Sequence, residues 1–263
     1  MNNDVLPNLK GRFPFRLSTT SYILPEAIMP NLRFLGHYLD EVELVLFDSH
    51  QGDNLPSVDE IAEMKSLGRD LQLTYNVHLP TDLLLGSADW RERQTACETI
   101  LRFYERTLPL DPTAYILHFE GPPGDHPLPE ELADWRRLLR ISTEWLLDHG
   151  IRRDLMALEN LSYPFSWIDI LADEFGLPIC LDLGHLLQRN ENILKKFNQY
   201  QDRITMMHLH GVGHRDHQRI TRIPDDDWFA VVKILGTFRG GLSLEVFSLE
   251  DLRPSLLRMA ELC

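Results

Sequence analysis

The sequence predicts a single α/β domain folded as a (β/α)8 TIM barrel, and three observations lead to this prediction. Eight short apolar runs alternate with longer amphipathic stretches along the chain. The runs are apolar almost throughout, which is typical of parallel strands covered on both faces. The length of 263 residues also suits one such barrel. We therefore expect one domain over 1–263, with an N-terminal extension over 1–12.

Each apolar run predicts one strand, and each strand is followed by a stretch long enough to cross back over a sheet. The predicted strands cover 15–20, 42–49, 73–80, 114–121, 155–161, 178–185, 204–211 and 242–247. Parallel strands need crossover connections, so this alternation indicates a parallel sheet. An open doubly wound sheet is the alternative. No glycine-rich phosphate loop follows the first run, and this weakens the alternative.

The amphipathic stretches carry helix signals at their ends. The predicted helices cover 57–70, 88–108, 129–150, 166–176, 225–236 and 249–262. Ser57 with Glu60 three residues later forms a capping box. Gly150 and Gly176 follow two of the helices, at the position where glycine commonly ends them. The stretch 121–129 is the most loop-like part of the chain.

Composition narrows the classes of partner. The formal charge of −14 argues against general nucleic-acid binding and against anionic membrane surfaces. The three cysteines form no CxxC pair, which is typical of reduced thiols in a cytoplasmic protein. The N-terminus does not resemble a signal peptide, and no segment approaches the roughly 18 apolar residues of a membrane span. We expect a cytoplasmic protein that acts on a small molecule.

Polar residues gather where the predicted strands end, which is where barrels of this type place their active sites. The metal-capable side chains at these ends and in the loop after the seventh strand are His78, His118, Glu120, Glu159, Asp182, His185, His208, His210, His214, Asp216, His217 and Glu245. Seven of the 11 histidines lie in this set. Buried carboxylates must be protonated, paired or bound to a cation. Their convergence with histidines favours cations.

Four short motifs in this region resemble the xylose isomerase-like TIM-barrel superfamily, which includes endonuclease IV-type apurinic enzymes and sugar epimerases. They are ALEN (157–160), LDLGH (181–185), MHLH (207–210) and LSLEVF (242–247). The resemblance implies a metal held by Glu159, Asp182, His208 and Glu245, with His185 near the substrate. The phosphodiester-cleaving branch adds histidines that match His78 and His118. Its final Asp-x-His pair has only the adjacent Asp216 and His217 as a counterpart here.

A narrower resemblance covers 15–36, 40–49 and 76–87, which are similar to the cobamide-remodelling phosphodiesterases. Those enzymes cut the nucleotide loop of cobalamin-type corrinoids so that the lower base can be exchanged. The resemblance implies more than one divalent ion, zinc or manganese, whose ligand preferences fit histidine and carboxylate. The implied ligands are His78, His118, Glu159, Asp182, His185, His208, Asp216, His217 and Glu245. Glu159, Glu245 and His118 are the implied catalytic residues.

Substrate contacts are expected from Tyr22, which follows the first strand, and from His210. Arg215 or Arg219 can clamp a phosphate, because a guanidinium group matches its geometry. Two other classes remain open. A single-metal isomerase or epimerase would use Glu159 and Glu245 as acid and base. A non-catalytic binding protein could keep the same barrel and metal.

Overall fold

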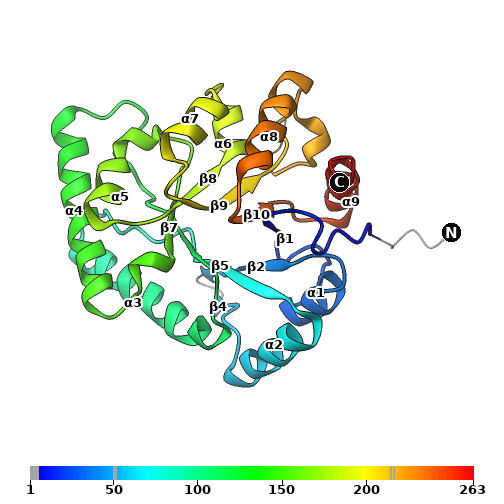
Figure 1. The fold of residues 1–263 in the computed structure, drawn as a ribbon. Helices are drawn as coiled ribbons and strands as arrows, with labels where there is room; N and C mark the ends of the chain where they lie inside the picture. Colours follow the sequence, from blue (N-terminus) through cyan, green and yellow to red (C-terminus); the bar gives the residue numbers. More distant parts are fainter. Residues whose placement is uncertain (1–5, 50–51, 214, 216) are drawn as a thin grey trace.

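The computed structural model describes residues 6–49, 52–213, 215 and 217–263, and it has the predicted barrel. Eight parallel strands form one sheet in the order β1-β10-β9-β8-β7-β6-β5-β2, surrounded by helices (Figure 1). The terminal strands β1 and β2 meet through a parallel bridge between Thr20 and Glu43. The nitrogen of Ser21 also donates to the carbonyl of Glu43 at 2.8 Å. The sheet therefore closes on itself, so the doubly wound alternative is wrong.

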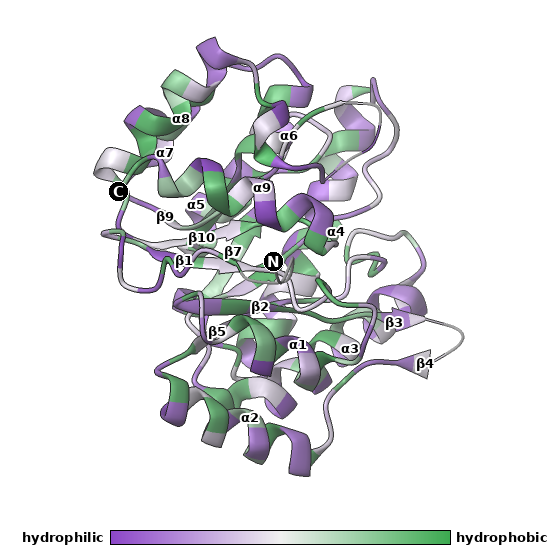
Figure 2. Ribbon diagram, turned by 90° about the vertical axis from the view of Figure 1, so that its right-hand side faces the viewer, coloured by the Kyte–Doolittle hydropathy of each residue, from purple (hydrophilic) through white to green (hydrophobic). Residues whose placement is uncertain are grey.

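The strands are shorter than the apolar runs that predicted them. The barrel strands are β1 (Arg16–Thr19), β2 (Glu41–Val45), β5 (Thr74–His78), β6 (Tyr115–Leu117), β7 (Met156–Glu159), β8 (Ile179–Asp182), β9 (Ile204–Leu209) and β10 (Gly241–Leu244). The predicted strand over 42–49 ends early, at Val45. Its last residues belong to a small antiparallel hairpin of β3 (Asp48–Ser49) and β4 (Gly52–Asp53), which projects from one end of the barrel (Figure 2).

The helices cover the outside of the barrel. They are α1 (Ile28–Leu35), α2 (Val58–Leu71), α3 (Trp90–Thr107), α4 (Pro129–Asp148), α5 (Asp169–Phe175), α6 (Leu183–Gln188), α7 (Ile193–Tyr200), α8 (Asp225–Thr237) and α9 (Leu249–Ala260). The predicted capping box is present, since Ser57 Oγ accepts from the Glu60 nitrogen at 3.2 Å and Glu60 Oε2 accepts from the Ser57 nitrogen at 2.8 Å. The helices α1, α6 and α7 were not predicted; α6 has only six residues, too few to show a clear helical period.

The described part of the N-terminal extension packs onto the barrel. Leu6 and Leu9 are buried members of the main hydrophobic core. The ammonium group of Lys10 donates to the carbonyls of Gly36 at 2.9 Å and Leu71 at 2.6 Å, where α1 and α2 end. Burial lowers the pKa of Lys10, and Asp40 partly offsets this effect. The extension thus fastens two outer helices to each other.

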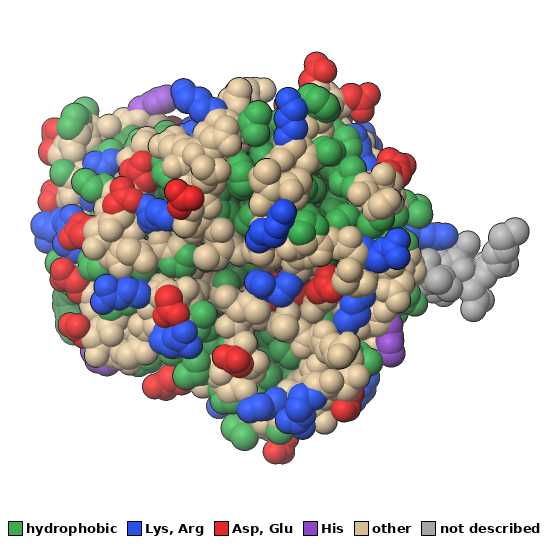
Figure 3. Space-filling model, viewed as in Figure 1, with side chains coloured by type: hydrophobic (Ala, Val, Ile, Leu, Met, Phe, Trp, Pro, Cys, Tyr) green, Lys and Arg blue, Asp and Glu red, His purple; other side chains and the backbone are tan. Residues whose placement is uncertain are grey.

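Charged side chains of both signs occupy one face of the molecule (Figure 3). On the face shown in Figure 3, basic and acidic side chains are interspersed. Among the described residues, no helix has the length and apolar character needed to cross a bilayer.

Candidate metal centre

The alternation of side chains along the strands explains why so many donors point into one barrel mouth. Ile116, Ala157, Cys180 and Met206 form a small buried apolar cluster with Ala114. The four residues that follow these by two positions are His118, Glu159, Asp182 and His208. Side chains two apart on a strand lie on the same face, so each donor stands directly above an apolar residue of the barrel interior. The apolar layer closes the bottom of the site.

The donors form five overlapping groups whose ligand atoms lie within 4.8 Å of one another inside each group. Two of these, one of His78, His208 and Glu245 and one of Glu159, Cys180 and His208, draw all their members except Cys180 from the others. The other three together contain nine residues. One group contains His78, His118 and Glu159, and a second contains Glu159, Asp182, His208 and Glu245. Glu159 belongs to both, as a bridging carboxylate would. The third group contains His185, His210 and His217. The three groups contain every predicted metal ligand except Asp216, and they add His210, which was predicted as a substrate contact.

Backbone carbonyls fix the orientation of two imidazole rings. The Nδ1–H of His78 donates to the carbonyl of Leu79 at 3.0 Å, and that of His185 donates to the carbonyl of Asn160 at 3.0 Å. A carbonyl can only accept, so each ring must carry a proton on Nδ1. Neutral imidazole then presents Nε2 as its lone-pair nitrogen. Rings that bind metals are typically oriented in this way.

His118 lies between two carboxylates. Its Nε2 is 2.8 Å from Glu159 Oε2, and its Nδ1 is 3.0 Å from Glu120 Oε1. Burial opposes the charged imidazolium, but the nearby charge of Glu159 and the hydrogen bonds outweigh it and raise the pKa of His118 to about 10. Burial would raise the pKa of Glu159, but His208 and His118 hold it well below its ordinary value. Glu120 belongs to none of the donor groups, but it contacts the donor His118 through its hydrogen bond.

Asp182 ends β8 and also caps the helix that follows. Its Oδ1 accepts from the backbone nitrogen of His185 at 2.7 Å, so the aspartate ends the strand as the spacing predicted. His185 itself lies in the first turn of α6 rather than in an open turn. Burial opposes ionisation of Asp182, but His185 and His210 lower its pKa overall. Burial lowers the pKa of His210, but the negative charge of Asp182 raises it by more, so the pKa of His210 rises to about 9.

Two carboxylate oxygens in the centre are suited to a cation. Asp182 Oδ2 and Glu245 Oε2 are buried and meet no hydrogen-bond geometry within the described residues. The imidazole nitrogen nearest to Asp182 Oδ2 is Nδ1 of His185, at 3.5 Å, and the one nearest to Glu245 Oε2 is Nδ1 of His208, at 3.2 Å. Buried anionic oxygens without hydrogen bonds are costly. Together with the mixed imidazole and carboxylate donors, they fit a divalent ion such as zinc or manganese.

The loop after β9 adds to the rim of the centre. His217 Nε2 is 3.3 Å from Glu245 Oε2, and its ring is 4.5 Å from that of His210. His214 and Asp216 lie outside the described residues, so the predicted role of Asp216 as a ligand stays a prediction. Arg215 donates to Asp251 Oδ2 at 2.5 Å, while most of its side chain remains exposed. Arg219 is 3.9 Å from the same carboxylate group.

An apolar cleft of about 610 Å³ opens beside the donors. It is lined by Tyr22, Ile23, Leu24, Pro25, Val45, Phe47, Phe247 and Ser248, which follow β1, β2 and β10. Phe247 contacts His217 with the ring centroids 5.4 Å apart, so cleft and donors share a border. Tyr22 forms one wall, and its hydroxyl accepts from Asn54 Nδ2 at 2.7 Å. The predicted substrate contact at Tyr22 is therefore placed in a cavity next to the centre.

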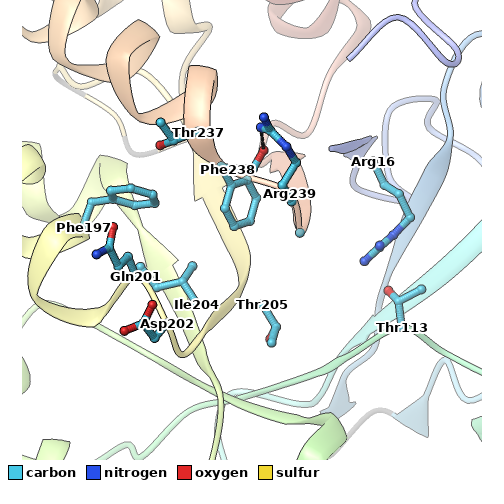
Figure 4. A pocket seen from close by; sticks show the side chains of 11 residues that line it. Arg16, Thr113, Phe197, Gln201, Asp202, Ile204, Thr205, Thr237, Phe238 and Arg239 are labelled. Atoms are coloured by element: carbon cyan, nitrogen blue, oxygen red, sulfur yellow. Dashed lines mark hydrogen bonds between the residues drawn. The ribbon is translucent and has the colours of Figure 1, made fainter. Parts of the chain in front are cut away.

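A second cavity, of about 580 Å³, lies at the opposite end of the barrel. Figure 4 shows its lining, which includes Arg16, Thr113 and Thr205 near the beginnings of their strands. None of the predicted site residues lines it. The cavity at the strand carboxyl ends is the one that adjoins the metal donors.

The comparisons agree with this architecture. Residues 35–262 match the family described as xylose isomerase-like TIM barrel. A D-tagatose 3-epimerase-like protein has a TM-score of 0.74 at 22% identity, covering 94% of this chain and 97% of that chain. A 3-keto-D-glucoside 4-epimerase from E. coli has a TM-score of 0.68 at 14% sequence identity, and the match covers 94% of this chain and 98% of that chain. The probable 3-DHS dehydratase from Bacillus anthracis has a TM-score of 0.68 at 16% sequence identity, and the match covers 94% of this chain and 99% of that chain. No curated protein sequence matches significantly.

Proposed function

Because the chain belongs to the xylose isomerase-like TIM barrel family, we propose that it is a metal-dependent enzyme of the phosphodiesterase type. The observation that carries the proposal is the shared Glu159, which joins two donor groups, with a third histidine group alongside. One divalent ion takes about four to six protein and water ligands. The nine residues of the three groups exceed that need. A centre for more than one ion suits displacement at phosphorus better than sugar isomerisation.

The donor groups define which residues would hold the ions. His78 and His118 would form an outer site with Glu159, and Asp182, His208 and Glu245 an inner site with the same carboxylate. When bound, divalent cations activate water and neutralise negative charge on a phosphodiester. Glu159, Glu245 and His118 are the residues placed to act on protons near the reacting atoms. Arg215 or Arg219 is exposed enough to reach a phosphate from the β9 loop.

The apolar cleft supports a substrate larger than a monosaccharide. Phe47 and Phe247 expose 45% and 43% of their surface at its rim. Large exposed aromatic side chains beside a polar centre are typical of ligand sites. A cobamide has a wide macrocycle next to its nucleotide loop and so presents both an apolar group and a phosphodiester. We propose this substrate from the sequence resemblance, and the cleft with Tyr22 is the place for its apolar part.

A single-metal sugar isomerase or epimerase is the second candidate. Two of the similar solved structures are a D-tagatose 3-epimerase-like protein and a 3-keto-D-glucoside 4-epimerase, the third is a probable 3-DHS dehydratase, and none of these three is named as a hydrolase. The comparisons therefore support this alternative better than the phosphodiesterase. In it, Glu159, Asp182, His208 and Glu245 would hold one ion, while Glu159 and Glu245 move the proton. His78 and His118 would then only contact substrate.

Metal content and turnover of the purified chain distinguish the two candidates. The protein is loaded with zinc or manganese, analysed for metal, and incubated with a cobamide and with a panel of ketoses. Two or more ions per chain and release of the nucleotide loop support the phosphodiesterase. One ion per chain with turnover of a ketose supports the epimerase and contradicts our first proposal.

His118→Ala gives a second discriminating result. In a multi-metal hydrolase the variant loses an ion and its activity, because His118 belongs to the outer donor group. In a single-metal epimerase it raises KM while kcat is largely kept. His37→Ala is the matched control, since His37 is exposed and outside all donor groups. It should behave as the wild type in both assays.

A further inference from the structure

Glu43 is a buried carboxylate that the proposed mechanism does not use. It lies in the middle of β2, its side chain is fully buried, and it belongs to none of the donor groups. Its Oε2 is 2.9 Å from Nε2 of His208, and both side chains are inaccessible to solvent. Its Oε1 has no hydrogen-bond partner within the described residues. A buried carboxylate is costly, so its one contact calls for a functional explanation.

His208 uses its two ring nitrogens for different neighbours. Nδ1 faces the inner donor group, 3.1 Å from Glu159 Oε1 and 3.2 Å from Glu245 Oε2. Nε2 points the other way, toward Glu43. A neutral imidazole carries one N–H and one lone pair. If Nε2 donates its hydrogen to Glu43, the lone pair of Nδ1 is available at the centre of the site.

We propose that Glu43 is a positioning residue that accepts the Nε2–H of His208 and thereby holds Nδ1 as the metal-facing atom. A carboxylate behind a histidine ligand orients the ring, selects its tautomer and makes the ligand nitrogen more basic. The inference rests on the proposed metal centre. It adds a residue from β2, a strand that contributes to none of the three donor groups.

Glu41 shows what a purely structural carboxylate looks like on the same strand. It lies two residues earlier, on the same face, and is equally buried. Its carboxylate accepts hydrogen bonds from Arg16, Thr74, Asn76 and Thr113 at 3.1, 3.1, 3.0 and 2.6 Å. Glu41 thus accepts four hydrogen bonds from side chains outside the donor groups, whereas the carboxylate of Glu43 has only His208 as a hydrogen-bond partner among the described residues. The contrast indicates that Glu43 serves the histidine.

Zinc affinity tests the proposal, with Zn²⁺ alone as the probe and a chromophoric chelator as competitor. Glu43→Leu should weaken zinc binding about 10–100-fold, the usual effect of removing a group behind a metal ligand. Glu43→Gln should weaken it less, because a carboxamide oxygen still accepts the N–H. Glu41→Gln is the matched control and should lower stability without changing zinc affinity. Wild-type affinity in a folded Glu43→Leu protein would overturn the inference.

The tautomer of His208 gives a readout that does not depend on whether the leucine variant folds. In a ¹⁵N-labelled, zinc-loaded wild-type protein, long-range ¹H–¹⁵N spectra should show the His208 ring protonated on Nε2. The signal is assigned by its loss in His208→Gln. Protonation on Nδ1 would overturn the inference and leave the metal centre intact. Failure of the wild type to bind zinc at all would overturn both the centre and this inference.

Discussion

At the scale of single residues, Asn160 connects two parts of the metal centre. Its side chain is buried, with Nδ2 donating to the carbonyl of Asp182 at 3.0 Å and Oδ1 accepting from the nitrogen of Asp182 at 2.8 Å. Its own carbonyl accepts from Nδ1 of His185. One amide therefore fixes the end of β8 and the ring that follows it. The sequence motif ALEN contains both this residue and the bridging Glu159.

Asn160→Ala should destabilise the fold. The substitution leaves the buried backbone nitrogen of Asp182 without its side-chain acceptor and removes one hydrogen bond to the carbonyl of Asp182. An unsatisfied buried group costs about 1–3 kcal/mol. Urea denaturation of the chelated protein measures the change in the free energy of unfolding. Asn198→Ala on the exposed surface of α7 is the control and should stay within about 0.5 kcal/mol of the wild type. Equal stability of the two variants would contradict this account.

The donor pKa values predict that zinc binds more weakly as pH falls. Without a cation, neighbouring carboxylates outweigh burial and raise the pKa of His118 to about 10 and that of His210 to about 9. Both imidazoles are then protonated at pH 7, and a metal can bind them only after they lose those protons. Zinc binding should therefore release protons at pH 7, and affinity should rise with pH up to these values. Calorimetry in buffers of different ionisation enthalpy measures the release. A value of zero would show that the histidines are already neutral.

At the scale of elements, α6 is placed by its close approach to β9. The helix begins directly after Asp182, and its second residue is Gly184. A Cβ atom at Gly184 would overlap the imidazole ring of His210. Only glycine allows the helix and the ring to occupy these positions together. The glycine of LDLGH thus has a packing role beside the two donors of the same motif.

Gly184→Ala should disturb the centre while the barrel stays folded. The added methyl group must push His210 away from His185 and His217, so we expect the chain to lose the ion held by that group. Metal analysis after loading measures the stoichiometry, and circular dichroism checks the fold. Gly236→Ala is the control, because nothing lies within 4 Å of a Cβ at that helical position. It should keep full metal content and gain up to about 1 kcal/mol of stability. Unchanged stoichiometry in Gly184→Ala would contradict the packing argument.

At the scale of the whole molecule, the centre joins strands that are far apart in the sequence. Its donors come from β5, β7 and β9 and from positions directly after or at the ends of β6, β8 and β10. An ion held by His78, His118 and Glu159 would connect β5, β6 and β7, and an ion in the inner group would connect β7, β8, β9 and β10, so both ions together would connect six of the eight barrel strands. At the closure, β1 and β2 meet through a single bridge. Metal binding and barrel stability should be coupled as a result.

Removal of metal should lower the thermal stability of the whole chain. A site held at 100 times its Kd adds about 2.7 kcal/mol to the folded state, which corresponds to roughly 5–10 °C in Tm for a chain of this size. Differential scanning calorimetry with and without a chelator measures the shift. Adding back zinc should restore Tm, whereas calcium, which prefers oxygen ligands, should restore much less. An unchanged Tm after verified metal removal would exclude coupling.

The sequence by itself determined the barrel and the mouth where its polar residues gather. The alternation of strands and helices is a local pattern. Parallel strands are buried on both faces, so each appears in the sequence as a short run of apolar residues. Each donor could be placed at a strand end because side chains alternate with a period of two. A local signal also located the capping box of α2, whereas the cap role of Asp182 became visible only with α6 in the structure. Short helices such as α6 escaped, because six residues show too little of a helical period.

Only the tertiary structure decided which donors lie within reach of one another and which groups contact them from behind. The bridging place of Glu159, the pairing of Glu120 with His118 and the contact of Glu43 with His208 join residues on different strands or in different loops. Glu43 escaped for a specific reason, since the apolar run over 42–49 continues past Val45, where β2 ends. Glu43 therefore looked like a residue near the start of the predicted strand, far from its carboxyl end, whereas it lies only two positions before the end of β2. The local sequence determines which face of a strand a side chain lies on. Which side chain of another strand it contacts depends on how the whole sheet closes.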